Sequence, residues 1–305
     1  MEIKYLQNNQ IDFDKWDQCI KRSYNGVIYA YSWYLNIVSE NWGALVLGDY
    51  ETVMPITSNK KYGINYLVQP IYSQQLGVFS NHKTNPGIVN TFLDNIPSSF
   101  KLIDIKLNIF NHAEEGKFVI ISNSNYELDL IQPYESLKEN FTVNTKRNIQ
   151  KARKHGISVM EGATANELIN LFKAEIGGPK NNFGDNEYNK LRQIIAFAIR
   201  HRSGEIYGAY TAENTLCAAT FFLKSNNRII NLVSASTEEG FEKRAMFAIM
   251  NEVILKNCEK NMILDFEGSN IEGIARFFKG FGSTKCEYQT IKLNNLPFPL
   301  NLLKK

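Results

Sequence analysis

Residues 262 to 269 of the chain read Met-Ile-Leu-Asp-Phe-Glu-Gly-Ser and describe the end of a strand and the start of a helix. Met262 to Phe266 is mostly apolar, as is typical of a strand. Gly268 favours a turn, and Ser269 with Glu272 matches the S/T-x-x-E capping box, in which two side chains satisfy free amide donors at a helix start. The segment therefore predicts a strand that leads directly into a helix.

The residues around this segment extend the pattern. Tyr207 to Leu223 predicts two strands joined at Glu213-Asn214, and Ile229 to Ser234 predicts a third. Apolar stripes at helical spacing mark two helices, at Leu191, Ile194, Ile195, Ala198 and Ile199 and at Met246, Ile249, Met250, Val253 and Ile254. Further capping boxes pair Thr164 with Glu167 and Ser236 with Glu239. With a last strand at Tyr288 to Leu293, this order predicts an α+β fold, a mixed sheet with helices on its faces.

The first half of the chain repeats this order. Leu45 to Leu47 and Val53 to Ile56 predict a hairpin, because Gly48-Asp49 between them tolerates the positive φ of a tight turn. Residues 86 to 96 predict a helix, and Leu102 to Leu107 alternates with period two like a half-buried strand. The repetition favours a duplicated fold.

Chain length and spacing favour two domains. The 305 residues are about twice the ~150 residues typical of one domain. The turns that begin at Gly48 and Glu213 lie 165 residues apart, and Asp104 and Asp265 lie 161 apart. We predict an N-terminal domain over residues 1–132 and a C-terminal domain over residues 133–305.

Composition excludes several classes of protein. With 44% hydrophobic and 21% charged residues the chain is of globular type, and a net charge of +3 is too small for a protein that binds polyanions over its whole surface. Four cysteines without a C-x-x-C pair suggest neither a zinc site nor a disulfide framework, so we expect no metal and a reducing compartment. No membrane span or leader is apparent, and a cytoplasmic location is expected.

The run from Lys146 to Lys154 holds five cations and no acid. On a predicted helix over residues 142–155, Arg147, Lys151 and Lys154 line one face, where phosphate groups would offset the repulsion between like charges. The alternative interpretation is a solvated linker helix between the two domains.

Two further stretches carry candidate catalytic groups. Alternation along the strand places Asp265 and Glu267 on one face at a carboxyl end, where open α/β sheets bind ligands. In the last helix, Arg276 and Lys279 are spaced to share a face and could hold an anionic group. Structural alternatives are a water-facing Glu267 and a helix that only packs on the sheet. The sequence has no G-x-x-x-x-G-K-S/T or G-x-G-x-x-G motif, and its histidines suggest no hydrolase triad.

The chain resembles the GNAT acyltransferase superfamily and, within it, the FemABX-like aminoacyltransferases, which are built from two GNAT-like domains. The resemblance rests on the basic run Lys146 to Lys154, on Asp265 to Ser269, and on Gly273 to Gly282 followed by Tyr288. Looser matches in the first half are Tyr31-Ser32-Trp33-Tyr34 and Tyr66-Leu67-Val68-Gln69-Pro70. The resemblance implies two GNAT-like (acyl-CoA N-acyltransferase) domains, each with a mixed, mostly antiparallel sheet flanked by helices.

The resemblance implies amide formation, in which an amine attacks the carbonyl of an activated acyl group. GNAT enzymes that use coenzyme A resemble one another in an R/Q-x-x-G-x-G/A loop that holds the pyrophosphate. Ser234 to Gly240 would be the corresponding stretch; it lacks the pattern, and Glu238 and Glu239 would repel a pyrophosphate. Coenzyme A is therefore disfavoured, and an aminoacyl-tRNA is the favoured donor; no bound cofactor is expected.

The resemblance also suggests roles for individual residues. The donor or acceptor phosphates would lie on Lys146, Arg147, Lys151 and Arg276. Asp265 or Glu267 would take the amine proton, with Lys279 or Arg276 at the anionic end, and Trp33, Tyr34 and Tyr72 would form a wall for a small-molecule or peptide amine. The family commonly has a Phe-Lys pair in its last helix, but here Phe278 stands at the lysine position.

Two alternatives stay open. The first is an inactive binding module that holds tRNA or another polyanion on the cationic helix. The second is an N-acetyltransferase that uses acyl-coenzyme A through an unusual loop. No DNA partner is expected, and the sequence names neither the acceptor nor the acyl group.

Overall fold

The computed structural model describes residues 2–61, 63–114, 116–175, 183–268, 270–298 and 301. The chain forms two compact units: unit 1 consists of Met1–Asn123 with Glu287–Lys305, and unit 2 of Ser124–Cys286. The sequence places one boundary at residue 132, whereas here the chain passes between the units at residues 123 and 286. The last segment returns to unit 1 because its strand pairs antiparallel with an early strand, Thr290 opposite Lys106.

Unit 1 contains a four-stranded antiparallel sheet and a second group of strands. The first has the order β1 (Ile3–Leu6), β2 (Gly43–Leu47), β3 (Thr52–Ile56), β6 (Phe79–Ser80). The second has the order β4 (Ser58–Lys61), β5 (Ile64–Val68), β7 (Phe100–Lys106), β14 (Thr284–Asn294). The predicted hairpin is β2–β3, and Gly48 at its turn has a φ of +63°, as expected for a tight turn.

The helices of unit 1 connect these strands. They are α1 (Phe13–Arg22), α2 (Ser32–Val38) and α3 (Pro86–Asp94), with short 3-10 helices η1 (Asn8–Gln10) and η2 (Ile28–Ala30). The Asn85 side chain accepts from the Ile88 amide and starts α3, with Pro86 as its first residue. α3 lies in the chain between β5 and β7, which are parallel, as a crossover between parallel strands requires.

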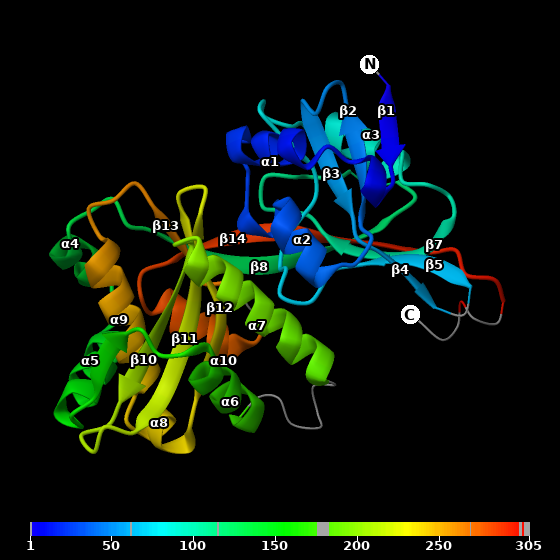
Figure 1. Ribbon diagram of the computed structural model, residues 1–305. Coiled ribbons are helices and arrows are strands. Elements are labelled where there is room, and N and C mark those ends of the chain that lie inside the picture. The colour runs from blue at the N-terminus through cyan, green and yellow to red at the C-terminus, as the bar shows by residue number, and fades with distance from the viewer. Residues whose placement is uncertain are drawn as a thin grey trace. The chain divides into compact units, whose positions relative to one another are not determined.

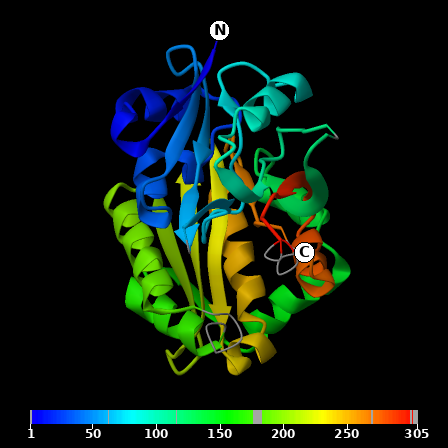
Figure 2. The ribbon, with the colours of Figure 1, turned by 90° about the vertical axis from the view of Figure 1, so that its right-hand side faces the viewer.

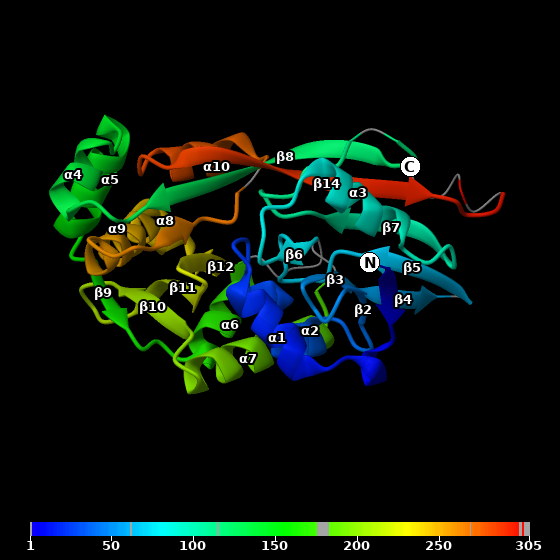
Figure 3. The same ribbon diagram turned by 90° about the horizontal axis from the view of Figure 1, so that it is seen from above.

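Unit 2 is a mixed sheet with helices on both faces (Figures 1 and 2). Its strand order is β8 (Val119–Asp129), β13 (Ile263–Asp265), β12 (Arg228–Ser236), β11 (Leu216–Ser225), β10 (Gly204–Tyr210), β9 (Ser158–Glu161). Neighbours in this order are antiparallel except β12 and β13, which are parallel. Seen from above, β12, β11 and β10 follow one another along the sheet (Figure 3).

The helices of unit 2 are α4 (Tyr134–Glu139), α5 (Val143–Lys154), α6 (Ala165–Glu175), α7 (Asp185–Arg200), α8 (Glu238–Glu242), α9 (Ala245–Asn257) and α10 (Glu272–Lys279). α6 and α7 contact one face of the sheet, α9 contacts the other, and α5 packs on α9 (Figure 2). The stripe predicted at Met246 to Ile254 lies on α9, where Ile249, Met250 and Val253 are buried in the core. The predicted α+β class is confirmed.

The three helix starts predicted from capping boxes have different outcomes. Thr164 and Glu167 form the capping box, with the Thr164 amide 2.7 Å from Glu167 Oε2 and the Glu167 amide 3.2 Å from Thr164 Oγ1. The prediction at Ser236 is wrong by one residue: Ser236 is still paired in β12, and Thr237 caps α8 through the Gly240 amide. Ser269 lies outside the described residues; α10 follows Ile271, whose apolar side chain forms no cap.

Candidate functional site

The two parallel strands of unit 2 separate toward their carboxyl ends. β13 pairs with β12 only from Arg228 to Ile230 and ends at Asp265, while β12 continues to Ser236. In open α/β sheets, ligands bind where neighbouring strands diverge at their carboxyl ends. We therefore expect a ligand-binding site of unit 2 at the carboxyl end of β12.

A pocket of about 520 Å³ lies at this end of β12 and is called the β12 pocket below. It is lined by Glu175, Ser234, Ala235, Ser236, Gly240, Phe241, Arg244, Met246, Phe247, Gly273, Ile274 and Phe277. These residues come from the ends of β12 and α6, from α8, from the start of α9 and from α10. The volume falls in the range of about 300–1,000 Å³ that is usual for small-molecule sites.

The walls of the β12 pocket are largely apolar. The rings of Phe247 and Phe277 pack edge to face with centroids 4.8 Å apart. Phe241 is 70% exposed and Ile274 is 41% exposed, which is unusual for side chains of this kind. Apolar side chains that gather in a hollow and stay open to solvent commonly mark a binding site.

Arg244 brings a cation into these apolar walls. It occupies the N-cap position of α9 in the left-handed conformation, with φ 64°. Its guanidinium carbon lies 5.5 Å from the centre of the Phe241 ring, and Nη1 donates to the Phe241 carbonyl at 3.4 Å. Its Nε is buried and has no hydrogen-bond partner among the described residues. A buried N–H without an acceptor is costly, and an oxygen of a bound ligand would satisfy it.

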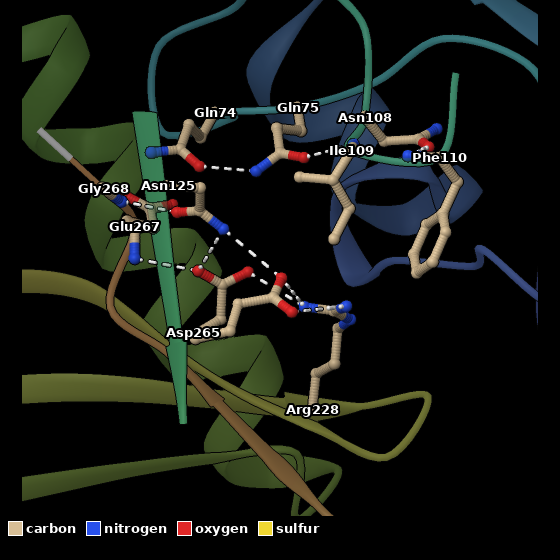
Figure 4. A network of polar contacts seen from close by, with 11 residues as sticks. Gln74, Gln75, Asn108, Ile109, Phe110, Asn125, Arg228, Asp265, Glu267 and Gly268 are labelled. Carbon is tan, nitrogen blue, oxygen red and sulfur yellow. Dashed lines mark hydrogen bonds and ion pairs between the residues drawn. The ribbon is translucent and has the colours of Figure 1, made fainter. Parts of the chain in front are cut away.

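The predicted acid Asp265 belongs to a buried network of unit 2 (Figure 4). Its Oδ2 accepts from Arg228 Nη1 at 3.2 Å, and its Oδ1 accepts from the Glu267 amide at 2.9 Å and from Asn125 Nδ2 at 3.1 Å. Arg228 also pairs with Glu127, with Nη1 2.6 Å from Oε1. Asn125 Oδ1 accepts from the Gly268 amide at 2.6 Å, so the network fixes the chain just beyond β13.

This network limits what Asp265 can do. Burial raises the pKa of its carboxyl group, while the neighbouring Arg228 lowers it. Both carboxylate oxygens are hydrogen-bonded, and the residue does not line the β12 pocket. The expectation that Glu267 shares its strand face is wrong, because β13 ends at Asp265 and Glu267 has φ 51°.

The last helix presents apolar side chains, not its cations, to the pocket. Ile274 and Phe277 line it, and Phe278 is buried against Tyr126 and Phe266. Lys279 is exposed and lies over the Tyr126 ring, with Nζ 5.7 Å from its centre. Arg276 pairs with Glu272 at 2.7 Å in solvent. The reason is rotation, since successive helical residues are turned by about 100°.

The basic run forms α5, which begins at the Thr142 cap. Thr145 and Ala152 are buried, and Lys146 Nζ donates to the Glu139 carbonyl at 3.0 Å. Its other cations, Arg147, Lys151, Arg153 and Lys154, are exposed and make no ion pair with the described residues. The cations of α5 thus form a positive surface open to solvent.

The aromatic residues predicted to bind the acceptor all belong to unit 1: Trp33 and Tyr34 lie in α2, and Tyr72 follows β5. Tyr34 is fully buried, and its hydroxyl donates to the Tyr72 carbonyl. Trp33 packs edge to face on Tyr34 with ring centroids 5.2 Å apart. Tyr34 therefore contributes to the core of unit 1, while Trp33 and Tyr72 are half-buried.

Sequence reasoning missed the residues that line the β12 pocket. The sequence pattern predicts a helix here from the stripe that begins at Met246, and it singles out none of Phe241, Arg244 and Phe247. Among the described residues, no group of three or more His, Cys, Asp or Glu side chains could hold a metal. None of the helices in the described residues combines the length and the apolar character that a membrane span requires.

Comparisons with known proteins bear on the fold. No protein-family model matches the chain, and no curated protein matches its sequence. FemX is similar in structure with a TM-score of 0.68 at 12% identity over 99% of each chain. L-PGS from Bacillus licheniformis has a TM-score of 0.54 at 10% identity, over 96% of this chain and 94% of that one. A C-terminal domain from Agrobacterium fabrum, assigned to a lysylphosphatidylglycerol synthetase, has a TM-score of 0.55 at 8% identity, over 96% of this chain and 94% of that one. The protein therefore has a FemX-type fold.

Proposed function

We propose that the protein is an acyltransferase that joins an activated acyl group to an amine, with the acyl end of the donor bound in the β12 pocket. The observation that carries this assignment is Arg244, whose buried Nε has no hydrogen-bond partner in the described part of the chain and which lies in an apolar hollow where β12 and β13 diverge. Such a site accommodates an apolar group and an adjacent oxygen. The fold shared with FemX supports the same class of chemistry.

The reaction balances without a covalent enzyme intermediate. The amine nitrogen attacks the carbonyl carbon, a C–N bond forms, and the C–O bond to the carrier breaks. The amine loses a proton, and the leaving oxygen gains one. An N–H placed at the carbonyl oxygen stabilises the charge that develops there, and Arg244 is the residue whose Nε is available for it.

An aminoacyl-tRNA is the proposed donor. The sequence places Ser234 to Gly240 against the R/Q-x-x-G-x-G/A pattern, but Ser234 to Ser236 belong to β12, so the pattern is compared instead with the residues that precede and open α9. These six residues, Glu242 to Phe247, have an acid at the first position of the pattern and Ala245 and Phe247 at its glycine positions. The Phe247 ring lines the pocket where a pyrophosphate would need bare backbone. The exposed cations of α5, which packs on α9, suit the phosphates of an RNA.

In this proposal Asp265 acts as a positioning residue. Its bonds to Asn125 and Arg228 hold the chain between β13 and α10, and α10 supplies Ile274 and Phe277 to the pocket. Trp33 and Tyr72 stay candidates for the acceptor side. The acceptor is a small-molecule or peptide amine, because the chemistry requires a free amine.

The test is transfer of label from tRNA. The full-length protein is incubated with tRNA charged in turn with each labelled amino acid, and with the small-molecule and peptide fractions of a cell extract as acceptors. Movement of label into an alkali-stable product supports the assignment, because an amide survives the base that hydrolyses an ester. Phe277→Ala, which opens one pocket wall, should reduce the rate, whereas Phe298→Ala at an exposed site of unit 1 should not. Label that leaves tRNA only as free amino acid would contradict it.

A binding module that lost catalysis is a second candidate, favoured by the exposed cations of α5 alone. It predicts tRNA binding of equal strength with charged and uncharged tRNA, and no transfer. Because the β12 pocket would then be unused, Phe277→Ala would leave tRNA affinity unchanged. The transferase predicts tighter binding of charged tRNA, and Phe277→Ala would remove that difference.

A further inference from the structure

Unit 1 contains a pocket of a second kind, and its lining is mostly polar. A pocket of about 470 Å³ is lined by Tyr5, Gln7, Glu40, Asn41, Ser58, Asn59, Lys60, Asn65, Ser99 and Phe100. An adjoining hollow of about 480 Å³ shares Tyr5, Gln7 and Asn41 and adds Asn8 and Asn9. We call the two together the amide groove; β1, β4 and β5, which carry several of its residues, are labelled in Figure 1.

We infer that the amide groove binds a neutral carbohydrate chain. Its chemistry differs from that of the β12 pocket, since carboxamides and hydroxyls dominate and one acid, Glu40, is matched by one base, Lys60. A carboxamide offers both a donor and an acceptor, which is what a sugar hydroxyl requires, whereas an anion would need an excess of cations. This site goes beyond the proposed transfer reaction and does not depend on it.

The amides of the groove are available to a ligand. The side chains of Asn41, Asn59, Asn65 and Ser99 make no hydrogen bond with any described residue. Asn59 and Asn65 lie on neighbouring strands, Asn59 opposite Tyr66 and Asn65 opposite Lys60. The side chains of these two residues therefore project from opposite faces of the β4–β5 hairpin, and both residues line the groove.

An aromatic ring completes the site. Tyr5 is 38% exposed and packs edge to face on the buried Phe100, with ring centroids 6.5 Å apart. Gly43 leaves room for this ring, because a Cβ there would lie 2.8 Å from Tyr5 Cε2. The hydroxyl of Tyr5 has no hydrogen-bond partner among the described residues. A fixed ring with one polar tip suits the apolar C–H face and the hydroxyl edge of a sugar.

The walls of the groove are held together without a ligand. Asn8 Nδ2 donates to the Trp42 carbonyl at 3.1 Å and ties η1 to the loop before β2. Ser58 Oγ donates to the Asn41 carbonyl at 3.5 Å and ties β4 to the same loop. A site that is already ordered loses little conformational entropy when it binds a ligand.

The test uses the full-length protein and three neutral hexasaccharides: maltohexaose, cellohexaose and chitohexaose. Saturation-transfer NMR and calorimetry should detect binding of at least one of them, with little dependence on salt because no phosphate or carboxylate is involved. Tyr5→Ala should weaken it about tenfold or more, and Asn59→Ala and Asn65→Ala about three- to tenfold each, in line with the loss of one ring contact or one hydrogen bond.

Control variants separate binding from folding. Asn81→Ala removes an exposed amide of unit 1 outside the groove and should leave affinity unchanged. Tyr5→Phe keeps the ring and should retain most of the affinity while the melting temperature stays that of the parent. Absence of binding to all three sugars at 10 mM, or binding that survives both Tyr5→Ala and Asn65→Ala, overturns the inference. Preferential binding of a neutral extended peptide at the same residues also overturns it. Label transfer from tRNA is measured separately, so failure here leaves that result unaffected.

Discussion

Arg228 is the residue whose loss should cost unit 2 most. It is 9% exposed and neutralises two carboxylates, those of Glu127 and Asp265. Arg228→Ala leaves both buried without a cation, and we expect the free energy of unfolding to fall by about 3–5 kcal/mol. Urea denaturation measures this. Lys138→Ala, which breaks an exposed pair with Glu135, should cost no more than about 1 kcal/mol. Equal effects of the two would contradict the network.

Arg244, in contrast, should contribute to catalytic activity and not to stability. Its backbone lies in the left-handed region at φ 64°, which glycine adopts without strain, and its Nε makes no hydrogen bond with the residues that the structure describes. Arg244→Gly should therefore raise the free energy of unfolding by about 1 kcal/mol and yet lower kcat/KM for transfer about ten- to a hundredfold. Arg244→Lys should recover only part of the activity, because an ammonium lacks the planar fork. A variant that loses stability and activity together would point to a merely structural role.

At the scale of elements, the start of α6 gives a prediction with a pH dependence. The Thr164 amide and hydroxyl both donate to Glu167, and this lowers the pKa of that carboxyl group. A lowered pKa means that the stabilisation is complete above the ordinary value of about 4.3 and is lost as the pH falls through the folded value. Thr164→Ala should cost about 1 kcal/mol at pH 7 and less at pH 3, measured by thermal unfolding. A cost that grows toward low pH would be inconsistent with the capping box.

The cationic surface of α5 makes a prediction about salt. If Arg147 and Lys151 contact phosphates, tRNA affinity should fall steeply with salt, and each removed contact should reduce the slope of log K against log salt by about 1. The double variant Arg147→Ala, Lys151→Ala should weaken binding of all tRNAs alike. Lys243→Ala, which removes a cation paired with Glu239, is the matched control. An unchanged slope in the double variant would exclude α5 as the RNA surface.

Most elements could be predicted from the sequence, because their signals are local. The hairpin at Gly48 and the stripe of α9 follow from turn chemistry and from periodicity. The α8 cap was missed by one residue, since pairing in β12 keeps Ser236 extended, and pairing is not local. The β12 pocket could not be found for the same reason: it depends on where β13 stops pairing and on which face α10 presents.

At the scale of the whole molecule, the choice of donor should be visible in thermal stability. A ligand that binds only the folded protein stabilises it by about 2.7 kcal/mol at a hundred times its dissociation constant. We expect charged tRNA to raise the melting temperature and acetyl-coenzyme A to leave it unchanged at saturating concentration. Phe247→Gly, which removes the ring from the glycine position of the loop, is the variant most able to admit coenzyme A. A shift of the parent protein by acetyl-coenzyme A would reverse the assignment.

The return of β14 to unit 1 has a consequence for how the protein is made. The Ala113 amide donates to the side chain of Gln289, which lies 176 residues further along the chain. Gln289 belongs to β14, and β14 is also the strand that pairs with β7. At about 5–20 residues per second, the ribosome needs on the order of ten seconds or more to supply that strand after β7 has emerged. Throughout that interval one edge of β7 stays open, so a chaperone that holds unfolded chains is most needed before residues 284–294 emerge.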